Sequence, residues 1–305
     1  MRPEPEGRSH PSDVGPVTSG VRRALLRTSD GVRIEAIYQP RRRPDPEREG
    51  PGGGRRDGPI GRGEGPGGEP SRTPAIVVAH GFTGSADRPA VRRVASAFAA
   101  HAAVVTFSFR GHGRSGGRST VGDREVLDVA AAVEWARALG HSRVATAGFS
   151  MGGSVVLRHA ALYSAVRGGR MEARTDAVAA VSAPARWHYR GTPPMRRVHW
   201  VISRPLGRSF GRYGLRTRIH DREWDPVPLS PVEAVPLIAP TPLLIVHGDR
   251  DPYFPVDHPR MLAAAGPSEL WLEPGMGHAE NAAPDALLER LGVWLADRAA
   301  PADGS

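Results

Sequence analysis

Four short runs of the chain are mostly apolar, which is typical of strands buried on both faces of a parallel sheet. These runs are residues 75–82, 103–109, 144–149 and 177–182. Segments with a helical spacing of apolar residues alternate with them, at 88–100, 123–139 and 151–163. Because strands and helices alternate, the sequence predicts βαβ crossovers and a parallel sheet with helices on both faces.

The two ends of this pattern extend the same sheet. Residues 21–26 and 32–38 are β-like runs that flank Asp30-Gly31, a dipeptide that favours a tight hairpin. Near the C-terminus the alternation continues with a strand, a helix, a strand and a helix. These elements are expected at residues 242–246, 256–264, 269–272 and 285–299.

The alternation stops between residues 184 and 236, a segment rich in aromatic residues and arginine. We interpret this segment as a cap inserted over the strand ends. The α/β core is then expected to comprise residues 21–183 and 237–300. Residues 1–20 and 40–74 are polar and rich in Pro or Gly, so they predict a disordered N-terminal arm and a disordered loop.

Composition excludes several classes of protein. The chain of 305 residues has no cysteine, so disulfides, zinc–thiolate sites and a cysteine nucleophile are excluded. The first residues contain no apolar signal segment, and no apolar run approaches the length of a membrane span, which predicts a soluble, cytoplasmic protein. The net charge of +9 comes entirely from arginine, as expected from GC-rich codon usage. No nucleic-acid partner is expected, because the basic stretches lack interleaved aromatics and a binding motif.

A G-x-S-x-G turn lies at the end of the third apolar run, where Gly148 and Gly152 flank Ser150. Such a turn between a strand and a helix holds a nucleophile in a strained conformation, and its flanking residues must be small. Ser150 is therefore the candidate nucleophile. The alternative is an ordinary Gly-rich turn between a strand and a helix.

Two later loops carry the groups that would activate this serine. One follows the strand at 242–246 and contains Asp249 and Asp251, and the other follows the strand at 269–272 and contains His278. A serine hydroxyl needs a base to take its proton, and the base needs a carboxylate to orient it. The order Ser, Asp, His is the one expected for this topology.

At this point the sequence resembles the α/β-hydrolase family, and most closely its cap-bearing serine hydrolases with esterase, monoacylglycerol-lipase and serine-aminopeptidase-like members. The matching motifs are H-G-F at 80–82, R-G-H-G-R-S at 110–115, G-F-S-M-G-G at 148–153, H-G-D-R-D-x-x-F-P at 247–255 and G-x-G-H at 275–278. The resemblance implies an α/β-hydrolase fold, a mostly parallel central sheet with helices on both faces and an inserted cap.

The resemblance also implies the roles of individual residues. Asp251 is the expected acid and His278 the expected base, whereas Asp249 is expected to cap its turn. The backbone N–H groups of Phe82 and Met151 are expected to form the oxyanion hole. The reaction expected is cleavage of an ester, thioester or amide through an acyl-enzyme. No metal or organic cofactor is implied.

Two other functions fit the same motifs. An acyltransferase or a cofactor-free perhydrolase would use the same three residues, and a non-catalytic ligand-binding homologue would use the same fold. A serine at position 150 argues against dehalogenase and epoxide-hydrolase chemistry, which uses a carboxylate nucleophile in this fold.

The cap carries the information about substrate. Between residues 185 and 219 there are nine arginines and no Asp or Glu. Either these arginines form a solvated outer face, or some of them surround the pocket mouth and attract an anionic small-molecule acyl substrate or an anionic lipid surface. Trp187, Trp200 and Tyr213 are the residues of the cap expected to contact the substrate.

Overall fold

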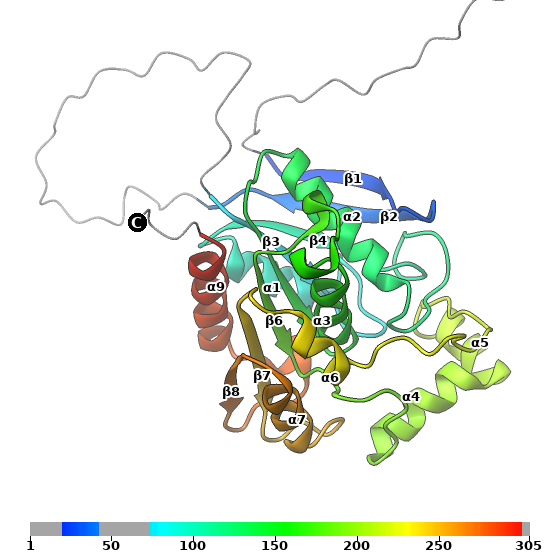
Figure 1. The fold of residues 1–305 in the computed structure, drawn as a ribbon. Helices are drawn as coiled ribbons and strands as arrows, with labels where there is room; N and C mark the ends of the chain where they lie inside the picture. The colour runs from blue at the N-terminus through cyan, green and yellow to red at the C-terminus, as the bar shows by residue number, and fades with distance from the viewer. Residues whose placement is uncertain (1–19, 43–72, 301–305) are drawn as a thin grey trace, which may run out of the picture.

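A computed structural model describes residues 20–42 and 73–300 as one eight-stranded sheet flanked by helices (Figure 1). The strand order is β1-β2-β4-β3-β5-β6-β7-β8, in which β1 and β2 are antiparallel to their neighbours and the other strands are parallel. The strands are β1 (Arg22–Arg27), β2 (Arg33–Gln39), β3 (Ala75–Ala79), β4 (Ala103–Phe107), β5 (Val144–Phe149), β6 (Ala177–Val181), β7 (Leu243–Gly248) and β8 (Glu269–Glu273). The predicted α/β-hydrolase sheet is therefore confirmed.

Helices cover both faces of this sheet. On one face lie α1 (Pro89–Phe98) and α9 (Asp285–Ala299), and on the other lie α2 (Glu125–Ala138), α3 (Met151–Leu162), α6 (Pro231–Ala234) and α7 (Asp257–Ala265). Short helical turns complete the chain: η2 (Ala165–Arg167), η3 (Met171–Ala173), η4 (Val235–Leu237) and α8 (Ala279–Ala282).

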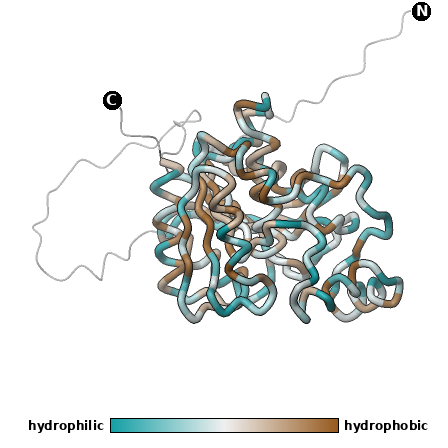
Figure 2. Tube along the Cα trace, turned by 60° about the horizontal axis from the view of Figure 1, so that its bottom comes forward, coloured by the Kyte–Doolittle hydropathy of each residue, from teal (hydrophilic) through white to brown (hydrophobic). Residues whose placement is uncertain are grey.

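Alternate residues of the central strands enter two separate cores. In β3, Val77 packs with the α2 and α3 side, whereas Ile76 and Val78 pack with the α1 and α9 side. The strands are accordingly apolar along their whole length, and in Figure 2 hydrophobic segments gather along them in the interior. Burial on both faces explains why the parallel strands could be recognised as continuous apolar runs.

A buried arginine ties the N-terminal hairpin to the rest of the core. Arg110 follows β4 and is 2% exposed. Its guanidinium makes a bidentate pair with Asp30 in the hairpin turn, at 2.7 and 3.0 Å, and also donates to Asp128 on α2 at 2.8 and 3.0 Å. Three segments distant in sequence therefore meet at one side chain.

The segment between β6 and β7 adds no strand to the sheet. We refer to residues 184–236 as the insertion. It contains α4 (Pro193–Ser203) and α5 (Pro205–Tyr213), which pack against each other and lie to one side of the sheet in Figure 1. The division of the chain into a core and a cap stays a prediction. The predicted arm at 1–20 and loop at 40–74 fall almost entirely outside the described residues.

No helix within residues 20–42 and 73–300 has the length and apolar character needed to cross a bilayer.

Candidate active site

The turn between β5 and α3 holds Ser150 in a backbone conformation that non-glycine residues rarely adopt, with φ 54° and ψ −116°. The flanking glycines are required by close backbone approach. A Cβ at Gly148 would lie 2.2 Å from Gly152 O, and one at Gly152 would lie 2.2 Å from Ala79 O. The sequence therefore specifies a strained turn that exposes the serine at the carboxyl end of the sheet.

Ser150 lies at one end of a hydrogen-bonded chain of three side chains. Its Oγ is 2.8 Å from His278 Nε2, and His278 Nδ1 is 2.7 Å from Asp251 Oδ2. The Asp251 side chain is fully buried and that of His278 is 16% exposed. With Nδ1–H donated to the carboxylate, Nε2 is the acceptor for the serine proton.

The loop after β7 prepares Asp251 to orient the histidine. Its Oδ1 accepts the backbone N–H groups of Tyr253 and Phe254 at 2.8 and 3.2 Å. Burial would raise the pKa of Asp251, but the hydrogen bond from His278 and these two N–H groups lower it below its ordinary value. Asp249 instead accepts the Gly275 N–H at 2.6 Å, which links its turn to the loop that carries His278.

Aromatic rings and a backbone hydrogen bond fix the position of His278. The rings of Tyr253 and Phe254 lie 4.3 and 5.7 Å from the imidazole, centroid to centroid. The next residue, Ala279, donates its N–H to Ser182 Oγ at 3.1 Å. The segment that bears the histidine is thus attached to the ends of β6 and β7.

The two predicted oxyanion donors lie beside Ser150 on different loops. Phe82 follows β3, and Met151 is the first residue of α3. Both line the same cavity as Ser150 and His278. In the part of the chain that the structure describes, neither backbone N–H donates to a protein acceptor, so both are available to a developing negative charge.

A buried carboxylate, Glu280, lies next to this loop and was not recognised from the sequence. Its Oε1 accepts the Gly81 N–H at 3.1 Å, while its Oε2 has no partner among the described residues. A Cβ at Gly81 would lie 3.3 Å from both carboxylate oxygens and 3.4 Å from Ser150 Cβ. Glu280 therefore holds the peptide that precedes Phe82. The G-x-G-H motif ends two residues earlier and gives no sign of this contact.

Three further histidines at the strand ends contact backbone groups of the loops. His80 lies 2.7 Å from Gly81 O through Nδ1 and accepts the Phe109 N–H through Nε2 at 3.0 Å. His112 lies 3.0 Å from Arg110 O, and His247 lies 2.8 Å from Phe254 O. Burial lowers the pKa of His80 to about 3, so it stays neutral in the fold.

A cavity of about 790 Å³ opens onto Ser150 between the strand ends and the insertion. Trp187 lines it, as predicted, with its indole N–H donated to Pro228 O and Leu229 O. Trp200 and Tyr213, which were also expected to contact the substrate, are 48% and 77% exposed and do not line this cavity.

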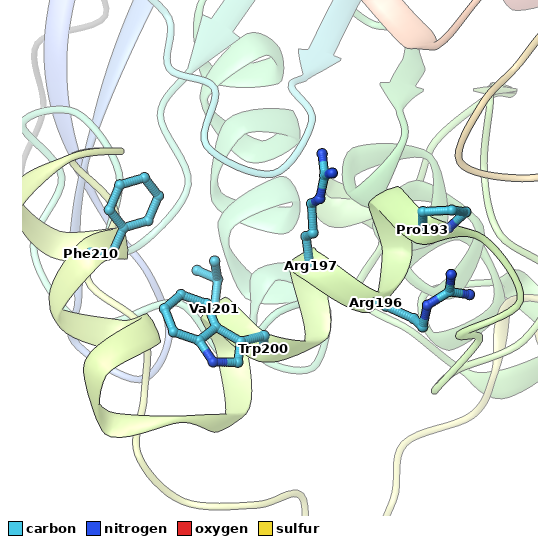
Figure 3. A pocket seen from close by; sticks show the side chains of 6 residues that line it. All are labelled: Pro193, Arg196, Arg197, Trp200, Val201 and Phe210. Carbon is cyan, nitrogen blue, oxygen red and sulfur yellow. The ribbon is translucent and has the colours of Figure 1, made fainter.

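The phase of helix α4 explains why Trp200 does not line the cavity. The cavity face of α4 contains Pro194, Val198 and Val201, at helical spacing, and Trp200 lies outside that stripe. It borders a separate open groove on α4 and α5 with Phe210 (Figure 3). Because the sequence predicted no helix in the insertion, it could not show which face of α4 carries Trp200.

Comparison with known proteins agrees with this fold. Residues 76–290 match the model of the alpha/beta hydrolase family, and the chain belongs to that family. No curated protein sequence matches it.

Several solved structures are similar across most of the chain. The esterase Pf2001 of Pyrococcus furiosus has a TM-score of 0.63 at 20% identity, with 98% of this chain and 99% of that chain covered. Est1E of Butyrivibrio proteoclasticus, solved with ferulic acid, has a TM-score of 0.56 at 19% identity, with 89% and 97% covered. The α/β hydrolase GrgF of a Penicillium species has a TM-score of 0.61 at 17% identity, with 92% and 99% covered. At these identities the similarity shows the fold alone.

Proposed function

We propose that the protein is a serine hydrolase that cleaves a carboxylic ester of a small-molecule substrate through an acyl-enzyme. The observation that carries this proposal is the continuous hydrogen-bonded chain from Ser150 Oγ through His278 to Asp251. The similar protein of Pyrococcus furiosus is named an esterase, which is why an ester is chosen here over a thioester or an amide.

Each step assigns a proton to a named atom. His278 Nε2 takes the proton of Ser150 as Oγ attacks the ester carbonyl, and the N–H groups of Phe82 and Met151 stabilise the oxyanion. Collapse of the tetrahedral intermediate expels the alcohol, which takes the proton from Nε2. Water then attacks the acyl-enzyme, again with His278 as base, and releases the carboxylic acid and free Ser150.

A fluorophosphonate probe tests the nucleophile. The wild-type protein should be labelled covalently at Ser150, and Ser150→Ala should lose the label. Ser154→Ala is a matched control, because Ser154 lies one turn further along α3 with its Oγ buried and unpartnered within the described residues. Labelling that persists in Ser150→Ala, or is lost equally in Ser154→Ala, would reject the assignment.

Product analysis distinguishes hydrolysis from acyl transfer. A hydrolase should release free acid in the presence of an added alcohol or peroxide, whereas a transferase or perhydrolase should form the corresponding new ester or peracid. The cytoplasmic location expected from the sequence stays a prediction.

A further inference from the structure

The arginines of the insertion have no carboxylate partners. The nine guanidinium groups between residues 185 and 219 lie more than 4.0 Å from every carboxylate oxygen of the described residues. The residues concerned are Arg186, Arg190, Arg196, Arg197, Arg204, Arg208, Arg212, Arg216 and Arg218. An unpaired cation beside a binding cavity is available for a ligand of opposite charge.

Only some of these arginines line the cavity that contains Ser150. They are Arg186, Arg190, Arg197 and Arg208, with Arg222 just beyond them. Three carboxylates line the same cavity: Asp221, Glu223 and Glu280. Five arginines against three carboxylates leave the wall with an excess of two positive charges.

None of the three carboxylates of the cavity wall forms an ion pair with Arg197 on α4. Glu280 accepts the Gly81 N–H beside the serine. A local backbone hydrogen bond lowers the pKa of Asp221, and the nearby His220, Arg118 and, last, Arg208 lower it further. Arg197 has neither an ion pair nor a side-chain hydrogen bond with any residue in 20–42 or 73–300. Arg197 on α4 is therefore one of the uncompensated charges of the cavity wall, together with Arg186 and Arg190, which precede the helix and form no ion pair within the described residues.

Arg196 and Arg197 are adjacent but face different surroundings. Arg197 lies on the cavity stripe of α4 with Val198 and Val201, and in Figure 3 its side chain extends from the helix toward the α/β core. Arg196 is turned to the segment before α4, where it lies 3.4 Å from Arg190 O and Gly191 O, and it does not line the cavity. Both residues border the open groove with Trp200 and Phe210, but only Arg197 also lines the cavity that contains Ser150.

We propose that the substrates carry an acidic group, a carboxylate or a phosphate, remote from the ester, and that Arg197 binds it. This inference rests on the proposed esterase function. The substrate would lie with its carbonyl at Ser150 and its acid at α4. A bound substrate shields the Arg197 guanidinium from part of the surrounding water. The ion pair between this guanidinium and the acidic group of the substrate is therefore stronger than an exposed surface pair.

Two esters of equal length test the proposal: the monoester of a dicarboxylic acid, and its analogue with the free carboxylate capped as a methyl amide. Arg197→Gln should lower kcat/KM for the anionic ester about tenfold, mainly through KM, and change the neutral ester less than about twofold. Arg197→Lys should recover part of the loss. Arg196→Gln, the matched control, should affect neither ester.

The outcomes separate this inference from the proposed function. Turnover of the neutral ester and fluorophosphonate labelling depend on the catalytic chemistry and not on Arg197. If both are absent, the proposed esterase function is rejected, whereas the role of Arg197 is judged from the anionic ester. Equal losses for Arg196→Gln and Arg197→Gln on the anionic ester would show a general surface charge effect and overturn the role of Arg197. No preference for the anionic ester in the wild-type protein would overturn it as well.

A sedimentation assay distinguishes a free acid from a lipid headgroup. Ser150→Ala protein is mixed with vesicles of phosphatidylcholine alone, or with a third of phosphatidylglycerol. The proposal expects no more sedimentation with anionic than with neutral vesicles. The alternative outcome is sedimentation with anionic vesicles that decreases equally in the Arg196→Gln and Arg197→Gln variants. That result would indicate that α4 binds a lipid surface, and it would overturn the proposed acid-binding site in the cavity.

Discussion

Arginines in the core and in the insertion have opposite surroundings. In the core, Arg110, Arg137 and Arg158 each lie against a carboxylate and join separate segments of the chain. In the insertion, the nine arginines between residues 185 and 219 have no such partner in the described structure. The core uses charge to hold its loops in place, and the insertion leaves charge available at a cavity. One residue type, abundant throughout the chain, is thus paired with carboxylates in the core and left without them in the insertion.

The largest expected effect concerns the chemistry carried by the core. His278→Ala and Asp251→Asn should each lower kcat by about 10⁴-fold or more for neutral and anionic esters alike. The double variant should be little worse than the poorer single variant, because the three side chains act as a unit. Steady-state kinetics on purified variants measure this. Losses that multiply in the double variant would contradict a shared mechanism.

A stability measurement compares the two kinds of arginine directly. Arg110→Met removes the partner of Asp30 and Asp128 and should lower the free energy of unfolding by about 3–5 kcal/mol. Arg212→Met on α5, where the guanidinium is exposed over the Tyr213 ring, should change it by no more than about 0.5 kcal/mol. Urea unfolding gives both values. Similar losses in the two variants would remove the distinction between core and insertion.

Acid should destabilise the core through its buried histidines. Burial lowers the pKa of His80 and of His159 to about 3, whereas an unfolded histidine titrates near about 6.5. Below pH about 6.5 the unfolded chain binds protons that the folded chain does not. The stabilisation from these neutral histidines is therefore fully present above pH about 6.5 and is lost progressively toward pH about 3. Each such histidine contributes up to about 1.4 kcal/mol per pH unit.

Urea unfolding between pH 8 and pH 4 measures this slope. His159→Phe removes one of the two groups and keeps a ring against Tyr163, so its stability should depend less steeply on pH than that of the wild-type protein. A His159→Phe variant whose stability depends on pH as steeply as that of the wild-type protein would show that His159 does not contribute to the slope.

The smallest expected effect concerns Glu280. Glu280→Ala removes the acceptor of the Gly81 N–H and should lower kcat by about tenfold for both esters, because the adjacent donor at Phe82 is displaced. Glu280→Gln retains a carbonyl oxygen for that N–H and should keep most of the activity. The ratio of anionic to neutral turnover should stay constant in both variants, in contrast to Arg197→Gln. Equal losses for Ala and Gln would indicate that the charge matters and the hydrogen bond does not.

Much of the fold and of the candidate site could be predicted, because both depend on local patterns. Strands β3 to β6 are buried on both faces and therefore appear as apolar runs. Ser150, Asp251 and His278 each follow a strand of one parallel sheet, so their loops meet at one edge.

Features that depend on tertiary partners could not be predicted. Glu125 and Asp128 lie fully buried in the first turn of α2, where a polar residue predicts an exposed face. Glu125 is held there by Ser119 and by backbone N–H groups that include that of Gly122. The same limit applies to α4, because which of its faces meets the sheet domain depends on tertiary packing, and that packing places Trp200 outside the cavity.

The backbone at Ser150 also sets stability against activity at a single position. A side chain held at φ 54° is strained, by about 1–3 kcal/mol, and glycine would relieve that strain. In a protein that no longer catalysed anything, replacement by glycine would be free of penalty and favoured by stability alone. Ser150→Gly should therefore yield a more stable protein that no longer turns over substrate, so that stability and activity make opposite demands on this one position.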